Sequence, residues 1–171
     1  MIVRSATPSD TADVARLCWA YRGVLVDRMA SIPGILDQYY AEPDYAALID
    51  KLPQIHARPR GDILLAVTDH PVGCAMYYPI SDHETEIKRI YVDPKARGLG
   101  AGRALISAAM DRAAADGYTR MVLDTVDTLT EAMTLYSAMG FAPCAPFYTP
   151  APEFAPRLRF YDIPLSPPSS A

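Results

Sequence analysis

The stretch from position 86 to position 103 constrains the fold of this 171-residue chain more than any other. Residues 87–92 are rich in β-branched and aromatic side chains, which is typical of a strand. Asp93 and Pro94 end that strand, because proline has no N–H for the ladder and restricts the residue before it. Three alternating glycines and a helix-like segment follow. The stretch therefore predicts a strand, a short turn, a glycine-rich loop and the first turn of a helix.

The glycine-rich loop has the features of an anion site. Gly98, Gly100 and Gly102 leave the backbone open to close approach by a ligand. The helix that follows directs its unpaired N–H groups and its positive dipole end toward the same place. Arg97 and Arg103 bracket the loop with fixed positive charge. This combination indicates a site for a phosphate-like group.

Other interpretations of the loop are less favoured. The P-loop pattern G-x-x-x-x-G-K-[ST] is absent from the sequence. A dinucleotide fingerprint would begin at Gly98 and Gly100 but has Arg103 at its third glycine, although Asp124 lies about where a ribose-binding carboxylate is expected. The loop also lies in mid-chain, without a second mononucleotide-binding half. A purely structural turn would not explain three glycines flanked by two arginines.

Around this stretch the pattern predicts an alternation of strands and helices. A strand at 2–6 precedes a helix that starts near Thr7 and Pro8, and a less regular helical region covers 35–52 with an interruption at Pro43. The later segments are strands at 62–67, 72–78 and 87–92 as an antiparallel meander, a helix ended by Gly117, a strand at 119–124, a helix capped by Thr128 and Glu131 and ended by Gly140, and strands at 141–148 and 158–165. This order predicts an α/β (mixed α+β) fold with helices on both faces of a mixed sheet.

Composition bounds the class of protein. Half of the residues are apolar and 21% are charged, which predicts one domain over residues 1–165 followed by a disordered tail at 166–171. A net charge of -4 argues against nucleic-acid binding. The cysteines Cys18, Cys74 and Cys144 lack metal-site or disulfide spacing, so no metal is expected. Without a signal-peptide pattern or an apolar run of about 18 residues, we expect a cytoplasmic protein with no membrane partner.

The residues from Arg97 to Gly102 match the [Q/R]-x-x-G-x-[G/A] signature, and the chain thereby resembles the GNAT superfamily of acetyl-CoA-dependent N-acetyltransferases. The preceding Ile-Tyr-Val-Asp-Pro and the later Leu135, Tyr136, Gly140 and Phe141 are placed as in that superfamily. The element order agrees from position 2 to position 165. The resemblance implies a GNAT-like, mostly antiparallel sheet of about seven strands.

The resemblance also implies acetyl-CoA as cosubstrate, with its pyrophosphate on the backbone amides of the glycine loop. Its pantetheine arm would run along the preceding strand, the fourth in the chain. That strand must then splay from the fifth, at 119–124. An N–H near Ile90 would stabilise the oxyanion. The superfamily often has asparagine where this chain has Leu129, so one contact to the arm is in doubt. The implied contact residues are Ile90, Tyr91, Val92, Arg97, Gly98, Leu99, Gly100, Ala101, Gly102, Arg103, Leu129, Ala132 and Tyr136.

Two catalytic residues follow from the resemblance. Tyr136 is expected to protonate the leaving thiolate; otherwise it packs against the cofactor sulfur. Glu86 is expected to act as general base for the amine; otherwise it is a salt-bridged glutamate beside Lys88 and Arg89.

The acceptor site is expected between the first two helices, Tyr77, Tyr78 and the final hairpin. On strict alternation Glu86, Lys88 and Ile90 share one strand face and Arg89 points away, unless a β-bulge intervenes. Arg89 in the cleft would favour an acceptor with a carboxylate. The candidate acceptor residues are Arg22, Tyr39, Tyr40, Arg89 and Tyr148.

The sequence thus predicts an N-acetyltransferase that moves an acetyl group directly to a primary amine, of an amino acid or another small metabolite. No acetyl-enzyme is expected, because the cysteines have no identifiable histidine partner. Two alternatives stay open: acetylation of protein N-termini or lysines, and a non-catalytic acyl-CoA-binding module. A homodimer through the C-terminal strands is expected only by analogy with the superfamily.

Overall fold

The computed structural model describes residues 1–30, 34 and 41–166. The expected tail beyond Ser166, and the candidate acceptor residues Tyr39 and Tyr40, lie outside these described residues. Among the helices of the described part, none has both the length and the apolar character needed to cross a membrane.

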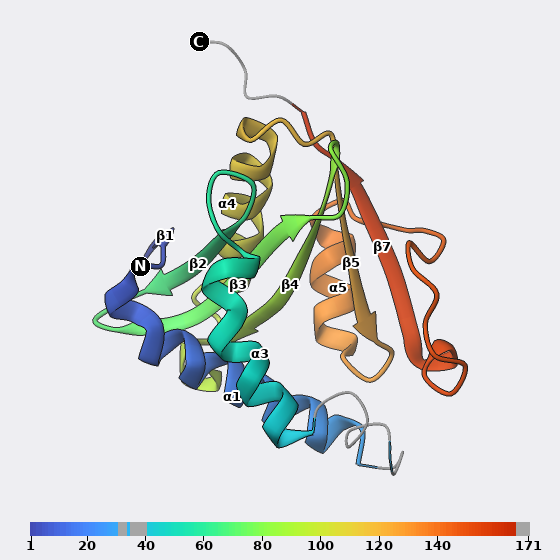
Figure 1. Ribbon diagram of the computed structural model, residues 1–171, viewed down its shortest axis with the longest axis horizontal. Coiled ribbons are helices and arrows are strands. Elements are labelled where there is room, and N and C mark those ends of the chain that lie inside the picture. The colour runs from blue at the N-terminus through green and yellow to red at the C-terminus, as the bar shows by residue number, and fades with distance from the viewer. Residues whose placement is uncertain (31–33, 35–40, 167–171) are drawn as a thin grey trace.

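Seven strands form one mixed sheet in the order β1-β2-β3-β4-β5-β7-β6 (Figure 1). Neighbouring strands are antiparallel except β4 and β5, which are parallel. The predicted fold class, including the antiparallel meander before the glycine loop, is therefore confirmed. The strands are β1 (Ile2–Ser5), β2 (Asp62–Val67), β3 (Pro71–Pro79), β4 (Glu84–Val92), β5 (Arg120–Val126), β6 (Ala142–Pro143) and β7 (Leu158–Pro164).

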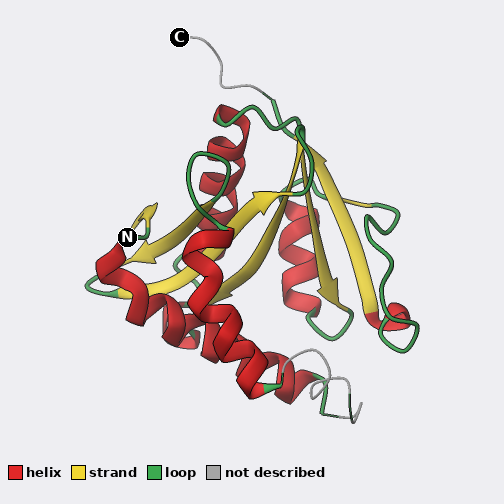
Figure 2. Cartoon of the chain, viewed as in Figure 1, coloured by secondary structure: helices red, strands yellow, loops and turns green. Residues whose placement is uncertain are grey.

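Helices cover both faces of the sheet (Figure 2). The helices are α1 (Thr11–Arg28), α3 (Glu42–Ile55), α4 (Ala101–Ala115) and α5 (Thr130–Ala138), with short 3-10 turns at Pro8–Asp10, Pro94–Ala96 and Ala155–Arg157. α1 and α3 bury their apolar stripes against one face, where Leu17 and Leu52 meet Leu65. α4 buries Leu105 and Ile106 against the other face. The sheet therefore separates these two cores, because the first five residues of β2 are all buried while successive side chains face opposite sides.

β4 and β5 are paired over only part of their length. Their register pairs join Glu84–Glu86 to Arg120–Val122, and no pair is recorded between the remaining described residues of the two strands. Figure 1 shows the strands meeting at one end and diverging toward the other. The predicted splay between the fourth and fifth strands is thus confirmed. It leaves one edge of β4 free to meet a ligand.

A β-bulge lies in the free half of β4. Met76 pairs with Lys88 and Cys74 pairs with Tyr91, so two residues of β4 lie opposite the single residue Ala75. Such a bulge bends the strand and changes which side chains share a face.

The bulge overturns the strict alternation expected for this strand. Arg89 takes the extra position with a φ of 53°, the only left-handed non-glycine residue among those described. Ile90 consequently packs in the α4 core with Ile87, on the opposite face from Lys88 and Glu86. Arg89 does not point away from the cleft but lines its cavities.

Several element boundaries differ from the sequence expectation. α3 starts at Glu42, because Pro43 then occupies the first turn, where its missing N–H costs nothing. The helix continues through Pro53 to Ile55. The expected strand at 141–148 shrinks to Ala142–Pro143. Its prolines cannot donate to a ladder.

The expected cap of α5 is also wrong. The helix starts at Thr130 with Leu129 at the N-cap and no side-chain cap. The hydroxyl of Thr128 is buried without a hydrogen-bond partner. Glu131 instead forms an ion pair with Arg28 of α1 at 2.5 Å.

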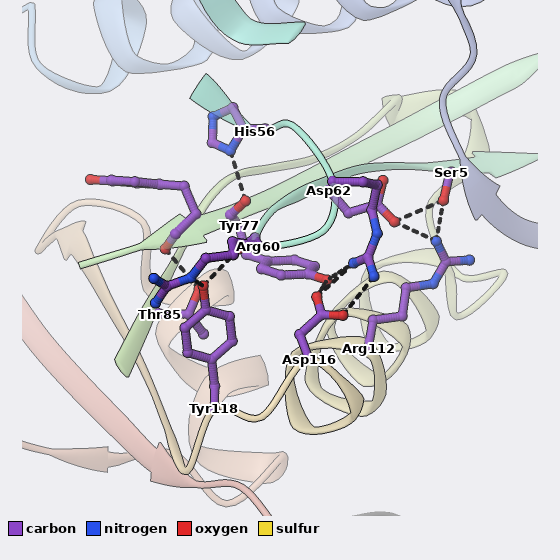
Figure 3. A network of polar contacts seen from close by, with 11 residues as sticks. Ser5, His56, Arg60, Asp62, Tyr77, Thr85, Arg112, Asp116 and Tyr118 are labelled. Atoms are coloured by element: carbon purple, nitrogen blue, oxygen red, sulfur yellow. Dashed lines mark hydrogen bonds and ion pairs between the residues drawn. The ribbon is translucent and has the colours of Figure 1, made fainter. Parts of the chain in front are cut away.

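A polar network ties the far end of the sheet to α4 (Figure 3). Asp116 accepts a hydrogen bond from the Tyr77 hydroxyl at 2.6 Å and pairs with Arg58 at 2.6 Å. Asp62 pairs with Arg112 at 2.5 Å. Tyr77 therefore points toward α4 and has no place in the acceptor site, contrary to expectation. Successive strand residues face opposite sides, so only its neighbour Tyr78 faces α1 and α3.

Candidate functional site

The glycine loop enters α4 through two left-handed residues. Gly98 has a φ of 83° and Gly100, the N-cap residue of α4, has a φ of 75°. An L-residue adopts this conformation only with strain, so glycine is required for the turn. Arg97 and Arg103 are exposed beside the loop, and neither forms an ion pair within the described residues. Their charge is therefore available to an anion.

A groove of about 610 Å³ runs from this loop along the free half of β4. β4 supplies one wall, and α5 supplies the other through Leu129, Ala132 and Tyr136. Leu99 is absent from this lining and is 58% exposed. The other residues expected to contact acetyl-CoA all lie on the lining, which comprises Tyr21, Val24, Ile90, Tyr91, Val92, Ala96, Arg97, Gly98, Gly100, Ala101, Gly102, Arg103, Leu129, Glu131, Ala132, Leu135 and Tyr136.

Tyr136 lies at the buried wall of this groove. Its ring packs at 6.1 Å from the rings of both Phe141 and Tyr161. Burial raises the pKa of the Tyr136 phenol, and the nearby charge of Asp124 adds to that shift. The phenol is consequently a protonated donor over the physiological range.

Glu86 is buried on β4, and both of its carboxylate oxygens have partners. The Tyr78 hydroxyl donates to Oε2, and the Lys88 ammonium donates to Oε1. Burial raises the pKa of Glu86, while Lys88 and the Tyr78 hydrogen bond oppose that rise. With 3% of its surface exposed, Glu86 is absent from the lining of the groove and of the two cavities described next.

Lys88 continues the contact across the split to β5. Its Nζ lies 3.3 Å from Oδ1 of Asp124, and the Tyr148 hydroxyl donates to Oδ2 of Asp124 at 3.2 Å. The flanking carboxylates raise the pKa of Lys88 although burial opposes this, so the residue stays an ammonium ion. We call the five groups Tyr78, Glu86, Lys88, Asp124 and Tyr148 the carboxylate row.

Two cavities open on the exposed end of the carboxylate row. One of about 70 Å³ and one of about 670 Å³ share Lys88, Arg89, Asp124 and Phe154 in their linings. Tyr148 and the segment 149–152 line the larger one only. Arg89 forms no ion pair within the described residues, so the cavities combine one carboxylate with an uncompensated guanidinium.

The structure brings together only part of the expected acceptor site. Arg89 and Tyr148 line the larger cavity. Arg22 lies elsewhere, 3.5 Å from Glu42 and 5.6 Å from the Trp19 ring. Asp124 was considered only as a ribose ligand of a dinucleotide site. The sequence feature that could have identified Asp124 is its charge within the apolar strand β5, because a carboxylate there needs a partner or a function.

A split mixed sheet with a glycine-lined anion loop at the split defines the acyl-CoA N-acyltransferase fold. A sequence profile of the Acetyltransferase (GNAT) family matches residues 29–141, and the chain belongs to this family.

Three known proteins illustrate the relationship. An uncharacterized N-acetyltransferase of Schizosaccharomyces pombe is 39% identical over 53% of this chain and 57% of its own length, so the chain spans little more than half of that relative. The IAA acetyltransferase of Azospirillum brasilense is 30% identical over 82% of this chain and 93% of its own length. The structure of yncA, a putative acetyltransferase from Salmonella typhimurium with its cofactor acetyl-CoA, superposes with a TM-score of 0.67 at 19% identity, covering 100% of this chain and 97% of that one.

Proposed function

We propose that this protein is an N-acetyltransferase that moves the acetyl group of acetyl-CoA directly to the primary amine of a small molecule. One observation carries the proposal. The groove that starts at the glycine loop runs along the free edge of β4 to Tyr136 of α5, and the carboxylate row crosses the same split. A cosubstrate, a proton donor and proton-accepting groups thus converge on one gap in the sheet.

The chain's own groups fit acetyl-CoA. The N–H groups at the start of α4, with Arg97 and Arg103, supply donors and charge for the pyrophosphate. A Cβ at Gly98 or Gly100 would meet nothing within 4 Å, so the space before the loop is open to a ligand. β4 offers its free edge to the amide-bearing arm, in the manner of an added strand. Bound acetyl-CoA supplies the activated thioester.

Tyr136 is the proposed acid, and the carboxylate row supplies the proposed base. Tyr136 lies in the groove wall and donates a proton to the departing sulfur. Glu86, the base expected from the sequence, is too enclosed to meet the amine, so within the row it holds the Lys88 ammonium beside Asp124.

The acceptor cavity favours a small molecule over a protein. Its volume is about 670 Å³, which suits a metabolite, and Tyr148 and a proline-rich segment form part of its lining. Arg89 gives it a positive wall, which favours an amine that also bears a carboxylate. A basic histone-like or lysine-rich peptide would instead need an acidic surface.

A thiol-release assay tests this proposal. The purified protein is given acetyl-CoA with the standard amino acids, with the corresponding decarboxylated amines and, separately, with lysine-containing peptides. We expect CoA release with at least one primary amine, faster for the carboxylate-bearing member of a matched pair. Tight binding of acetyl-CoA without release under any of these amines would favour the non-catalytic module. Release only with peptides would favour protein acetylation.

A further inference from the structure

Asp124 is the carboxylate at the open end of the carboxylate row. It lies on β5, directly across the split from the bulge of β4, and lines both acceptor cavities. Its side chain is 18% exposed, compared with 4% for Glu86. Of the two carboxylates, only Asp124 is therefore reachable by a molecule in those cavities.

The hydrogen bonds of the row leave Glu86 with no free face. One of its oxygens is held by Lys88 and the other by Tyr78, so an incoming ammonium group would have to displace a bound donor. Asp124 is held less closely, by contacts of 3.3 Å from Lys88 and 3.2 Å from Tyr148. The Tyr148 contact is at the surface, where that residue is 41% exposed.

The charges in the row do not balance. Glu86 and Asp124 are two carboxylates, and among the described residues Lys88 is their only ion-pair partner. One further cation at Asp124 would complete two charge pairs. A carboxylate–ammonium pair in a partly buried site is stabilised by its reduced exposure to water.

We infer that Asp124 binds the acceptor's ammonium group and takes its proton, with Lys88 and Glu86 as the residues that position Asp124. The inference rests on the proposed function and names the residue of that site that touches the acceptor. It also defines the acceptor class further: the amine end lies at Asp124 and a carboxylate end lies at Arg89, so the preferred acceptor is zwitterionic.

The proton and electron transfers balance. An N–H bond of the ammonium breaks and an O–H bond forms on Asp124. The lone pair thus freed attacks the acetyl carbon, a C–N bond forms, and the C–S bond breaks with its electron pair on sulfur. Tyr136 gives its proton to that sulfur, and the nitrogen loses its second proton as the amide forms, which restores the phenol. Asp124 returns its proton to solvent.

Other ionisable groups face Asp124 from every neighbouring element, and the pH dependence of the reaction reflects all of them. Arg89 and Lys88 of β4 set the positive side of its surroundings. Burial raises the pKa of the Tyr78, Tyr136 and Tyr148 phenols, so these three act as donors and not as bases. The groups are Tyr21 of α1, Tyr45 of α3, Tyr78 of β3, Glu86, Lys88 and Arg89 of β4, Tyr136 of α5, and Tyr148 before β7.

The test compares the wild type with Asp124→Asn, using the panel amine that the wild type turns over fastest. We expect the variant to lose about 100-fold in kcat/KM for the amine at pH 7, the usual scale of a general base. Its kcat/KM should then climb about tenfold per pH unit toward the amine's own pKa, because only amine that is already neutral can react. Calorimetric affinity for acetyl-CoA should stay within about twofold, which shows that the variant is folded.

Two comparison variants sharpen the result. Asp127→Asn removes a carboxylate of similar exposure (21%) that pairs with Arg157 and lines neither cavity, and it should keep the wild-type profile. Glu86→Gln should lower kcat but leave the KM for the amine within about twofold, because it does not touch the acceptor.

Three results would overturn the inference. A wild-type enzyme that releases no CoA with any amine would remove the proposed function and this role together. Release by the wild type with an unchanged rate and pH profile in Asp124→Asn would remove only the role of Asp124. A raised amine KM in Glu86→Gln with no change in Asp124→Asn would transfer the contact to Glu86.

Discussion

Arg89 shows how a single residue can be kept in an unfavourable conformation next to a binding site. A left-handed non-glycine residue costs roughly 1–2 kcal/mol. Its backbone carbonyl accepts a hydrogen bond from the Cys74 thiol at 3.4 Å, and the bulge places its side chain in the acceptor cavities. Strain of this kind persists where the surrounding structure fixes it, commonly at functional sites. We therefore expect stability and selectivity to be opposed at this position.

Arg89→Asn tests that opposition. Asparagine tolerates the left-handed region better than arginine, so the free energy of unfolding should be unchanged or higher by up to about 1 kcal/mol. Without the guanidinium, the preference for carboxylate-bearing over decarboxylated amines should fall at least about tenfold. Urea unfolding and the matched amine pairs measure the two effects. A variant that keeps the preference would show that Arg89 does not meet the acceptor.

The proposed role of Tyr136 as the acid depends on a single atom, its phenol oxygen. Tyr136→Phe removes the phenol oxygen and keeps the ring that packs on Phe141, so kcat should drop about 10- to 100-fold while the affinity for acetyl-CoA stays the same. Tyr161→Phe is the matched control, since that buried ring lies 6.1 Å away and does not line the groove. An unchanged kcat in Tyr136→Phe would exclude it as the acid.

At the scale of elements, α4 is the helix whose N-terminus defines the cosubstrate site. Its entry depends on Gly100 at the N-cap, whereas its exit depends on Gly117, which has a φ of 94°. Both glycines are left-handed, and an added Cβ would meet nothing within 4 Å at either position. The two therefore differ in location and not in steric cost.

Gly100→Ala and Gly117→Ala form a matched pair on that basis. Each should lower the free energy of unfolding by about 1–2 kcal/mol through backbone strain. Only Gly100→Ala should also weaken acetyl-CoA binding, by about tenfold or more, because it distorts the loop that supplies the N–H groups. Calorimetry with acetyl-CoA separates them. Equal affinities in the two variants would place the pyrophosphate elsewhere.

Sequence reasoning succeeded for elements whose signals are local. The strand, turn, glycine loop and helix from 84 to 115 follow from β-branched residues, proline, glycine and a periodic apolar face. Sequence reasoning was wrong where the structure depends on pairing between strands. The β3–β4 bulge arises from a register shift that strand alternation alone does not reveal, and it reversed the expected orientations of Arg89 and Ile90.

The same division holds for the candidate site across the whole molecule. Glu86, Arg97 and Tyr136 stand in recognisable local patterns, and the sequence singled them out. Tyr148 was also named as a candidate, but its contact with Asp124, and the contact of Asp124 with Lys88, lie across the gap between β4 and β5 and follow from no local pattern. A site assembled across a gap in a sheet depends on how far the strands separate, and local sequence patterns do not predict that distance.

At the scale of the whole molecule, one buried histidine makes the stability of the fold sensitive to acid. His56, at the end of α3, is 3% exposed; its Nδ1 contacts the Tyr77 carbonyl oxygen at 2.9 Å, and its Nε2 is buried without a partner. Burial lowers the pKa of His56 to about 4 from 6.5. A depressed pKa means that the unfolded chain binds the proton first, so the stability contributed by neutral His56 is present above pH 6.5 and is lost as pH falls toward 4.

The expected loss over that interval is about 3 kcal/mol, from roughly 1.4 kcal/mol for each pKa unit. His56→Gln should make the free energy of unfolding less dependent on pH between 6.5 and 4, whereas His70→Gln, at an exposed position, should leave the wild-type dependence intact. Urea titrations at several pH values measure both. Parallel curves for the wild type and His56→Gln would contradict the assignment.

In the proposed reaction, the acetyl group passes from acetyl-CoA directly to a small amine within the split of the sheet. A single-turnover reaction with isotopically labelled acetyl-CoA, followed by mass spectrometry of both the small molecules and the intact protein, tests it most directly. We predict that the label appears on the amine nitrogen as CoA is released, while the mass of the protein stays constant throughout. A labelled protein that forms first and then decays into product, or CoA release without a labelled amine, would contradict the claim.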